Sequence, residues 1–222
     1  MVNFKSRATI PVEVADLQEI YSRLLESFGP QHWWPADTPF EVIIGAILTQ
    51  QTAWKNVEIA IENLKKANLL DVKSLHGAST ERIEKEVQPT GFYRRKSKSV
   101  KNFIDFLMEE YQGDVKKMVA EYGQKLREKL LTVKGIGHET ADSILLYACD
   151  KLFFVVDTYT KRALRRLGMI ETDSYEQIRS FSENSLPRDL NLYKEFHALF
   201  VELGKRFCKA KPICEKCPLN DI

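Results

Sequence analysis

Apolar residues recur at three- and four-residue spacing along almost the whole chain, which is the pattern of helices that bury one face. The first two helical segments contain the apolar sets Val14, Leu17, Ile20, Tyr21, Leu24, Leu25 and Phe40, Ile43, Ile44, Ile47, Leu48. Further helical patterns cover residues 53–66, 80–87, 95–111, 120–131, 138–149, 158–168, 174–185 and 190–207. Glycine and proline breakers separate them, as in QPTG at 88–91. The sequence therefore predicts an all-α protein.

One segment has the composition of a strand. It is LFFVVD at residues 152–157, and it is isolated among helical patterns. A single strand cannot build a sheet. We expect it to be an extended, buried connection between two helices.

Composition narrows the class of protein. The 222 residues are 44% hydrophobic, enough for a sizeable core. The formal net charge of +2 conceals two basic clusters, Arg94, Arg95, Lys96, Lys98, Lys101 and Lys161, Arg162, Arg165, Arg166. These clusters fit phosphate contacts and solvated surface equally well. No apolar run approaches about 18 residues and the N-terminus has no signal-peptide core, so we expect a cytoplasmic, nucleoid-associated protein without a membrane partner.

The segment LTVKGIGHETADSI at 131–144 contains a tight turn that leads directly into a helix. Two glycines flank one apolar residue, so backbone amides are exposed where the next helix adds its own free N–H groups. Such a turn either joins two packed helices or binds an anion. Apolar faces lead in and out of it, which is a helix-hairpin-helix pattern that grips a DNA phosphate without reading sequence. The candidate DNA-binding residues are Lys134, Gly135, Ile136, Gly137, His138 and Thr140.

Asp157 follows the apolar run VV and directly precedes a new helix. Taken alone, it is an ordinary helix N-cap. The combination of GIGHETADSILLYA with VVDT, 20 residues after the hairpin, is more specific. It resembles the helix-hairpin-helix-Gly/Pro-Asp superfamily of DNA glycosylases, in particular the endonuclease III family.

The resemblance covers about residues 30–218 in the same chain order. AILTQQTAW at 46–54 is similar to the family segment whose glutamine, here Gln50, fills the gap left by an everted base. GFYRRKSKSV at 91–100 is similar to a second family segment. The family fold implies a helical-bundle lobe at residues 36–145, a second lobe from 1–35 plus 146–207, and a cysteine loop at 208–222, with the DNA groove between the lobes.

A base inside a duplex is out of reach, so such an enzyme flips the nucleotide into a pocket. Breaking the N-glycosidic bond builds positive charge on the sugar. A nearby carboxylate stabilises that charge or activates the attacking water. The resemblance implies that Asp157 is this catalytic carboxylate.

Glu139 stands where family members that also cut the backbone carry a lysine, whose amine forms a Schiff base with the sugar. A carboxylate cannot form one. We therefore expect a monofunctional glycosylase without AP-lyase activity. Glu139 also suits the first turn of a helix, where an acid favours the helix dipole, and both roles are compatible.

Three tryptophans lie within about twenty residues, in QHWWPADTPFEV at 31–42 and at Trp54. They are either ordinary core or a binding pocket. The arrangement resembles the 3-methyladenine DNA glycosylase branch of the family, in which aromatic rings sandwich the base. Alkylated purines are cationic and stack well on indoles. The resemblance implies a base pocket formed by Trp33, Trp34, Pro35, Trp54 and Glu139.

Three of the four cysteines, Cys208, Cys214 and Cys217, lie in the last fifteen residues, which is unlike a disulfide framework. Their spacing C-x5-C-x2-C is close to the family's C-x6-C-x2-C-x5-C, which holds a 4Fe–4S cluster. The fourth cysteine would be residue 223. A chain cut one residue short, an unusual ligand and a degenerate site remain open, as do Zn²⁺ and no metal at all. Cys149 is expected to be a buried apolar side chain.

The expected function is therefore removal of alkylated purines such as 3-methyladenine in base excision repair, by a monomer acting on double-stranded DNA with a damaged base. Two alternatives remain. An endonuclease III-like or mismatch glycosylase acting on oxidised pyrimidines or G/T pairs would share Asp157 and Gln50. A non-catalytic helix-hairpin-helix DNA-binding protein would need the hairpin but not Asp157.

Overall fold

The computed structural model describes residues 16–222, so Val14 of the first predicted helix lies outside the described residues. Within this part of the chain every regular element is a helix. The α-helices are α1 Leu17–Phe28, α2 Pro39–Leu48, α3 Trp54–Lys66, α4 Val72–Gly77, α5 Thr80–Val87, α6 Tyr93–Tyr111, α7 Val115–Ala120, α8 Gly123–Thr132, α9 His138–Ser143, α10 Thr158–Arg166, α11 Tyr175–Ser185 and α12 Leu190–Arg206. Two 3-10 turns, η1 Gln88–Thr90 and η3 Cys214–Lys216, and one π-helical turn, η2 Ile144–Ala148, complete them. The all-α prediction is confirmed.

Most helices begin where the sequence places a short polar side chain. That side chain accepts a hydrogen bond from a free backbone N–H of the first turn, which typically stabilises the helix by about 1 kcal/mol. The capping residues are Asp16, Thr38, Asp71, Ser79, Asp114, Asp157, Ser174 and Asp189. Helix starts are therefore encoded locally, and packing of the apolar faces then fixes the arrangement.

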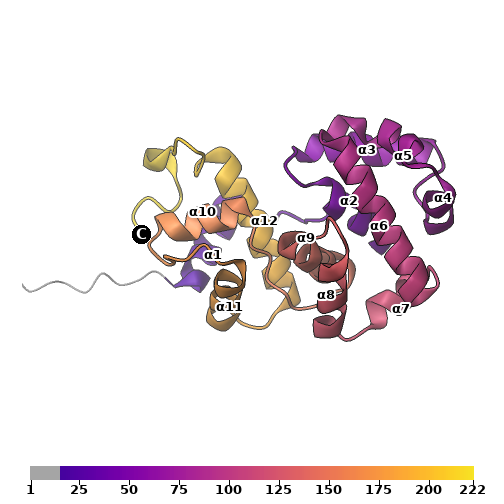
Figure 1. Ribbon diagram of the computed structural model, residues 1–222. Helices are drawn as coiled ribbons and strands as arrows, with labels where there is room; N and C mark the ends of the chain where they lie inside the picture. The colour runs from indigo at the N-terminus through magenta and orange to yellow at the C-terminus, as the bar shows by residue number, and fades with distance from the viewer. Residues whose placement is uncertain (1–15) are drawn as a thin grey trace, which may run out of the picture.

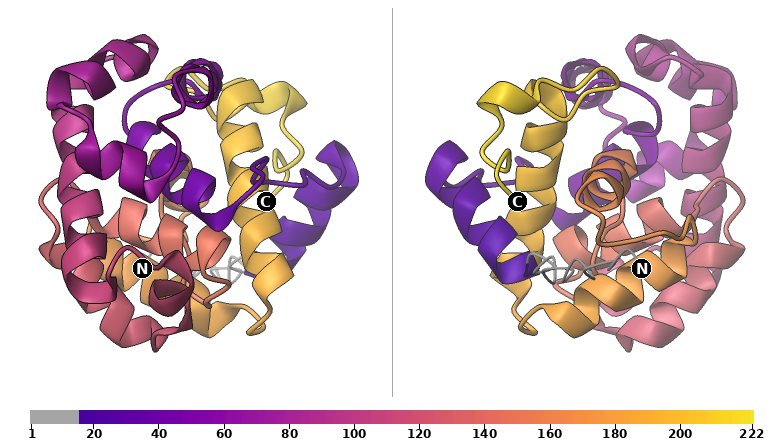
Figure 2. Two further views of the ribbon diagram at one scale, coloured as in Figure 1. Left: turned by 90° about the vertical axis from the view of Figure 1, so that its right-hand side faces the viewer. Right: turned by 90° about the vertical axis from the view of Figure 1, so that its left-hand side faces the viewer.

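The helices form two groups (Figure 1). One group contains α2 to α9, and the other contains α1, α10, α11, α12 and the C-terminal cysteine loop. The end-on views show α12 lying lengthwise beside the N-terminal helix (Figure 2), and α12 also packs against α10. The predicted lobe limits at 35/36 and 145/146 stay a prediction, since the second falls inside η2, which contacts both α2 and α12.

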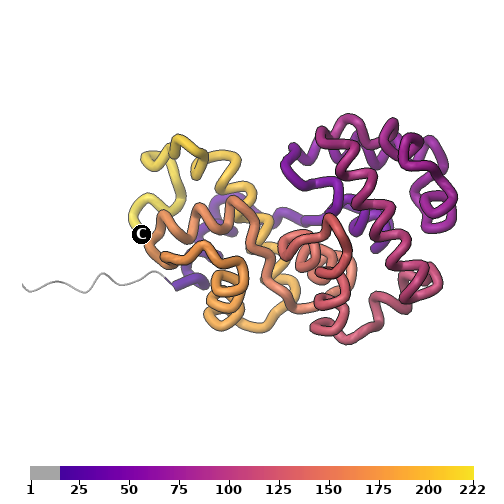
Figure 3. The backbone as a smooth tube through the Cα atoms, in the orientation of Figure 1, coloured from indigo at the N-terminus to yellow at the C-terminus, as the bar shows by residue number. Residues whose placement is uncertain are grey.

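The chain passes between the two groups in two connections, residues 29–38 and 149–157 (Figure 3). The first connection carries Trp33 and Trp34, and the second ends at Asp157. The second connection is the apolar run predicted to be extended, and it is neither helical nor part of a sheet. Phe154 and Val155 are fully buried within it.

Side chains of α11 accept hydrogen bonds from backbone amides of this connection, as a neighbouring strand would do in a sheet. The Phe154 amide donates to Glu183 Oε1 at 3.0 Å, and the Val156 amide donates to the Tyr175 hydroxyl at 3.4 Å. Buried backbone amides need such partners. The extended prediction for 152–157 is therefore confirmed, with the hydrogen bonds supplied by α11.

Three helical predictions need correction. The pattern missed α4 and α7, which have six residues each and are too short to show a period. The predicted helix at 120–131 begins only at Gly123. The predicted helix at 138–149 changes after Ser143 from α to π geometry. None of the helices described in residues 16–222 is both long and apolar enough to cross a membrane.

Candidate active site

A pocket of about 670 Å³ lies where the two connections meet the first helical group. Its lining includes the α2–α3 turn from Thr49 to Trp54, the tryptophans Trp33 and Trp34, and the first turn of α9. Asp157, the first turns of α10 and three side chains of α12, His197, Val201 and Lys205, complete the lining. Residues far apart in sequence, from Trp33 to Lys205, therefore face one space.

Three indole rings form the aromatic wall. The Trp33 and Trp54 ring centres are 5.1 Å apart, and those of Trp34 and Trp54 are 5.0 Å apart in an edge-to-face contact. Trp54 is fixed further by its Nε1–H, which donates to Glu58 Oε1 at 2.9 Å. The Lys205 ammonium lies 5.6 Å from the Trp33 ring centre, within cation–π range. The structure thus brings the three predicted tryptophans together at one pocket.

Pro35 does not join them in lining this pocket. It lines a separate pocket of about 230 Å³, on the far side of Trp34 and Trp54, together with Glu41 and Glu58. The two tryptophans Trp34 and Trp54 line both pockets, whereas Pro35 lines only the smaller one. A role of Pro35 as a wall of the base pocket stays a prediction.

The two carboxylate oxygens of Asp157 have different neighbours. One carboxylate oxygen caps α10, accepting the Thr160 amide at 2.7 Å. The other, Oδ2, lies 3.7 Å from His197 Nε2. Burial raises the pKa of Asp157, but His197 and the Thr160 amide outweigh it and hold the pKa below its usual value. A buried carboxylate that stays ionised is suited to stabilise a developing positive charge.

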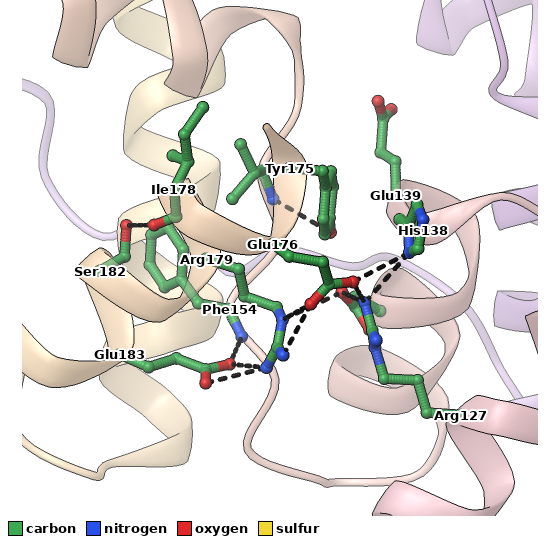
Figure 4. A network of polar contacts seen from close by, with 12 residues as sticks. Arg127, His138, Glu139, Phe154, Tyr175, Glu176, Ile178, Arg179, Ser182 and Glu183 are labelled. Carbon is green, nitrogen blue, oxygen red and sulfur yellow. Dashed lines mark hydrogen bonds and ion pairs between the residues drawn. The ribbon is translucent and has the colours of Figure 1, made fainter. Parts of the chain in front are cut away.

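Glu139 lies on the first turn of α9 and lines the same pocket as Asp157. Its side chain points away from its neighbour His138 (Figure 4). The Glu139 side chain keeps access to solvent, but protein surrounds it within the pocket. This partial loss of water, together with the negative charge of Asp157, raises the pKa of Glu139 to about 7. The pocket therefore holds two carboxyl groups with pKa values moved in opposite directions.

The hairpin between α8 and α9 requires its first glycine. Gly135 has φ +100°, and a Cβ there would lie 2.0 Å from Ser99 Oγ of α6. The Asn102 side chain of α6 donates to the Lys134 carbonyl at 2.8 Å, which fixes the turn against that helix. Gln50 Nε2 donates to the Gly135 carbonyl at 3.0 Å. The candidate gap-filling glutamine therefore touches the hairpin directly.

The remaining hairpin residues divide between surface and core. Lys134 and Gly137 are exposed, Ile136 is 5% exposed and anchors the turn, and Thr140 is buried where it lines the pocket. His138 stacks on Tyr175 with ring centres 5.3 Å apart. Its Nδ1 also lies 3.0 Å from Glu176 Oε1. The His138 ring is therefore held toward α11 by the group drawn in Figure 4, although half of its surface stays open.

The first basic cluster is only partly available to a phosphate. Arg94, Arg95 and Lys98 are exposed on α6, whereas Lys96 is 2% exposed and donates to the Thr90 carbonyl at 2.7 Å. Burial, together with neighbouring Arg95, lowers the pKa of Lys96 to about 8. Lys96 thus braces the turn before α6.

The second basic cluster lines a further pocket of about 620 Å³ that shares Glu139 and Asp157 with the first. Arg162 Nε donates to the Cys208 carbonyl at 2.6 Å, and Arg166 Nη1 contacts Cys208 Sγ at 3.4 Å. Two arginines of α10, the helix that Asp157 caps, therefore dock the cysteine loop.

Cys208, Cys214 and Cys217 line one pocket of about 200 Å³ between α10, α12 and the chain end. Among the described residues, no three His, Cys, Asp or Glu side chains are grouped closely enough to hold a single metal ion. Arg166 Nη1 donates to the Cys208 thiol at this cavity. Cys149 is 5% exposed in a different part of the fold, and burial raises the pKa of its thiol to about 12.

Sequence reasoning missed three features of this region. His197 and Lys205 sit in a regular helical pattern, so nothing local marked them as pocket residues. Phe92 is 61% exposed, with φ +46°, at the start of α6. The signal available in the sequence for Phe92 was an aromatic residue that follows a glycine and lies close to arginines.

The fold is helical, with a hairpin beside a pocket that three tryptophans and a buried aspartate line. The family model described as "HhH-GPD superfamily base excision DNA repair protein" matches residues 44–188. The chain belongs to this superfamily.

Relatives of known sequence agree. A protein of Methanocaldococcus jannaschii, named provisionally as a DNA repair glycosylase, is 47% identical over 93% of this chain and 94% of its own length. Endonuclease III of Thermotoga maritima is 29% identical over 92% of this chain and 91% of its own length. The resemblance to endonuclease III-like enzymes is confirmed over nearly the whole chain.

Solved structures agree as well. The H. pylori 3-methyladenine DNA glycosylase bound to 1,N6-ethenoadenine has a TM-score of 0.77 and 31% identity, covering 86% of this chain and 98% of that one. An endonuclease III–DNA complex has a TM-score of 0.78 at 22% identity, covering 90% of each chain, and shows the shared fold. The chain is thus a DNA glycosylase of base excision repair.

Proposed function

We propose that the protein is a monofunctional DNA N-glycosylase that removes alkylated purines such as 3-methyladenine from double-stranded DNA. The observation that carries this proposal is the pocket that Trp33, Trp34 and Trp54 line together with the buried Asp157. Similarity to a 3-methyladenine DNA glycosylase supports it. A purine made cationic by alkylation gains from stacking on electron-rich indoles.

Binding begins with the duplex held along the hairpin. Backbone amides of Lys134–Gly137 contact a phosphate, which fixes the position of the duplex without reading its sequence. The damaged nucleotide rotates into the pocket at an unstacking cost of a few kcal/mol. Gln50, which contacts Gly135, occupies the gap that the nucleotide leaves.

Asp157 then acts on the sugar. The C1′–N bond breaks, and its electron pair leaves with the base, which neutralises the positive charge of an alkylated purine. Asp157 stabilises the positive charge that develops on the sugar. Water forms the new C1′–O bond, and its proton passes to Asp157 and then to solvent. A base that leaves as a neutral molecule needs little help from an acid.

Absence of AP-lyase activity is part of the proposal, because Glu139 has no amine. A lysine does face the pocket, however. Lys205 lies over Trp33, so its amine is engaged by the ring. Borohydride trapping on a damaged duplex should give no covalent complex. A trapped complex that disappears in Lys205→Ala would identify Lys205 as a nucleophile and would overturn this part of the proposal.

A 4Fe–4S cluster held by Cys208, Cys214 and Cys217 is proposed as a structural group of the C-terminal loop. The shared cavity and the arginines of α10 support it. The cluster would tie the loop to the helix capped by Asp157. Iron analysis and visible absorbance of freshly purified protein test this proposal, and a protein with neither iron nor absorbance would contradict it.

The test of the proposed substrate is a panel of duplexes containing 3-methyladenine, 7-methylguanine, an oxidised pyrimidine, uracil or a G/T pair. Release of the alkylated purines, lost in Trp54→Ala, is the expected result. Release of thymine, uracil or oxidised pyrimidines alone would identify the mismatch or endonuclease III-like alternative. Binding without release of any base would leave a DNA-binding protein.

A further inference from the structure

Asp157 has a histidine neighbour on a different helix. His197 of α12 is 6% exposed and Asp157 is 9% exposed. His197 Nε2 faces Asp157 Oδ2 at 3.7 Å, and no described residue gives this nitrogen a hydrogen bond. The buried Nε2 of His197 thus faces an oxygen of Asp157 without another hydrogen-bond partner, at a distance that a small shift would turn into a hydrogen bond.

A tyrosine sets the proton positions on this histidine. The Tyr147 hydroxyl donates to the Lys194 carbonyl at 3.0 Å, because a carbonyl has no proton of its own to give. The same hydroxyl oxygen lies 2.7 Å from His197 Nδ1. Its one proton is already used, so it accepts from Nδ1–H. This hydrogen-bond pattern assigns a proton to Nδ1 and directs Nε2 at Asp157.

A second proton on Nε2 completes the arrangement. Without it, a nitrogen lone pair would face a carboxylate in a buried site. With it, Nε2–H points at Asp157 Oδ2 as a hydrogen-bond donor. Burial raises the pKa of Asp157, and among the opposing influences that lower it, His197 is the largest.

The same residues touch the wall of the base pocket. The ring centres of Trp34 and Tyr147 are 5.3 Å apart, and those of Tyr147 and His197 are 5.7 Å apart. His197 itself lines the pocket. A continuous chain of contacts therefore runs from the aromatic wall to the carboxylate.

We propose that Tyr147 and His197 are positioning residues for Asp157: Tyr147 fixes the His197 ring, and His197 holds the carboxylate ionised and turned toward the sugar. This inference rests on the proposed role of Asp157 and does not depend on which base is removed. It adds to the reaction two residues, Tyr147 and His197, that the sequence analysis did not assign to the site.

Other charged or polar groups line the same space. They are Glu139 of α9, Tyr159 and Arg162 of α10 and Lys205 of α12. Among them, Glu139 changes charge near neutral pH, since its pKa is raised to about 7 by the enclosing protein and by Asp157. Loss of activity at acidic pH therefore reports protonation of Asp157. A change of activity near neutral pH reports the titration of Glu139.

The test compares single-turnover excision at saturating enzyme with DNA affinity for His197→Gln and Tyr147→Phe. A misoriented catalytic group can cost about 100-fold in rate, so His197→Gln should lose about that much while affinity for the damaged duplex stays within about twofold. The acidic limb of its pH profile should move to higher pH, because Asp157 loses the neighbour that lowers its pKa. Tyr147→Phe keeps the ring. It should lower the excision rate and move the acidic limb to higher pH, each by less than His197→Gln does.

The matched control is His76→Gln, which breaks another histidine–aspartate pair, His76–Asp105 at 3.6 Å on the surface of α4 and α6. It should leave rate and pH profile unchanged. Wild-type rate and acidic limb in both pocket variants would overturn the inference, as would a rate loss that is equal at every pH. If His197→Gln does not fold, Tyr147→Phe alone decides.

The assay uses whichever base the wild type releases, with Asp157→Asn beside it. Excision that survives in Asp157→Asn would refute the proposed catalytic aspartate. An inactive Asp157→Asn together with fully active His197→Gln and Tyr147→Phe would refute only the present inference.

Discussion

The side-chain amide of Gln50 donates a 3.0 Å hydrogen bond to the carbonyl of Gly135, so the gap-filling candidate and the hairpin proposed to hold DNA are in contact before DNA arrives. The two residues are 85 positions apart in the sequence. The contact places the hairpin beside Gln50, which lines the pocket. Insertion of the glutamine and the grip on the phosphate are therefore expected to be coupled.

Replacing Gln50 by Ala should weaken binding to a duplex with an abasic site by about 10-fold, because one net hydrogen bond of roughly 1 kcal/mol and the gap-filling side chain are lost. Fluorescence anisotropy measures the dissociation constant. Gln124→Ala is the control, since Gln124 lies on α8 and bonds to exposed Glu128. Equal affinities for Gln50→Ala and wild type would contradict a role for Gln50 in the gap.

Gly135→Ala should lower the free energy of unfolding by about 2 kcal/mol or more, because φ +100° is strained for any other residue and the new Cβ would meet Ser99 Oγ. Chemical denaturation measures it. Gly77→Ala is the matched control, since nothing lies within 4 Å of a Cβ there and its φ is not in the positive region. A Gly135→Ala protein as stable as the control would show that the hairpin has another stable conformation.

The ion pairs shown in Figure 4 join the hairpin side of the molecule to α11. Arg127 Nε lies 2.6 Å from Asp142 Oδ1, and its Nη2 lies 2.6 Å from Glu176 Oε1. Asp142 is fully buried, so Arg127→Met should cost about 3 kcal/mol of stability by leaving a buried carboxylate without its partner. The double variant Arg127→Met/Asp142→Leu should recover part of that loss in thermal unfolding. No recovery would mean that Arg127 acts mainly through Glu176.

The raised pKa of Glu139 makes stability depend on pH. The folded protein holds the Glu139 proton up to about pH 7, whereas an unfolded glutamate releases it near about 4.3. Between these values the folded state binds more protons, so this contribution to stability is lost as pH rises. Thermal melts should show Glu139→Gln gaining on wild type between pH 5 and pH 8.

The control for that experiment is Glu109→Gln on the exposed side of α6. Its difference in melting temperature from wild type should be the same at both pH values. A Glu139→Gln difference that does not change with pH would show that Glu139 releases its proton like an ordinary surface glutamate.

Sequence features with a local cause were predictable. The hairpin depends on two glycines, and Asp157 stands between an apolar run and a helix that it caps, so both positions are marked by their immediate neighbours. The helices were predictable in the same way, because the spacing of apolar residues along the sequence marks them. The grouping of Trp33 and Trp34 with Trp54 was available only from family resemblance, because the bend that joins them forms in the folded chain.

Features that depend on distant partners were not predictable. His197 lies 40 residues after Asp157 and occupies a core position of a regular helix, so its sequence context looks apolar rather than catalytic. Lys96 belongs to a basic run, yet helical geometry turns it inward with Val100 and Phe103, at i+4 and i+7. The short helices α4 and α7 were missed for a different reason, since six residues are too few to show a helical period.

The central claim is that Asp157 is the catalytic carboxylate of a glycosylase. The direct measurement is single-turnover release of 3-methyladenine from a methylated duplex by wild type and Asp157→Asn, with DNA affinity measured beside it. Asparagine caps a helix as well as aspartate does, so the fold and α10 should be retained. We predict that Asp157→Asn binds the duplex as wild type does and loses base release by at least about 100-fold. Equal release by the two proteins would contradict the account.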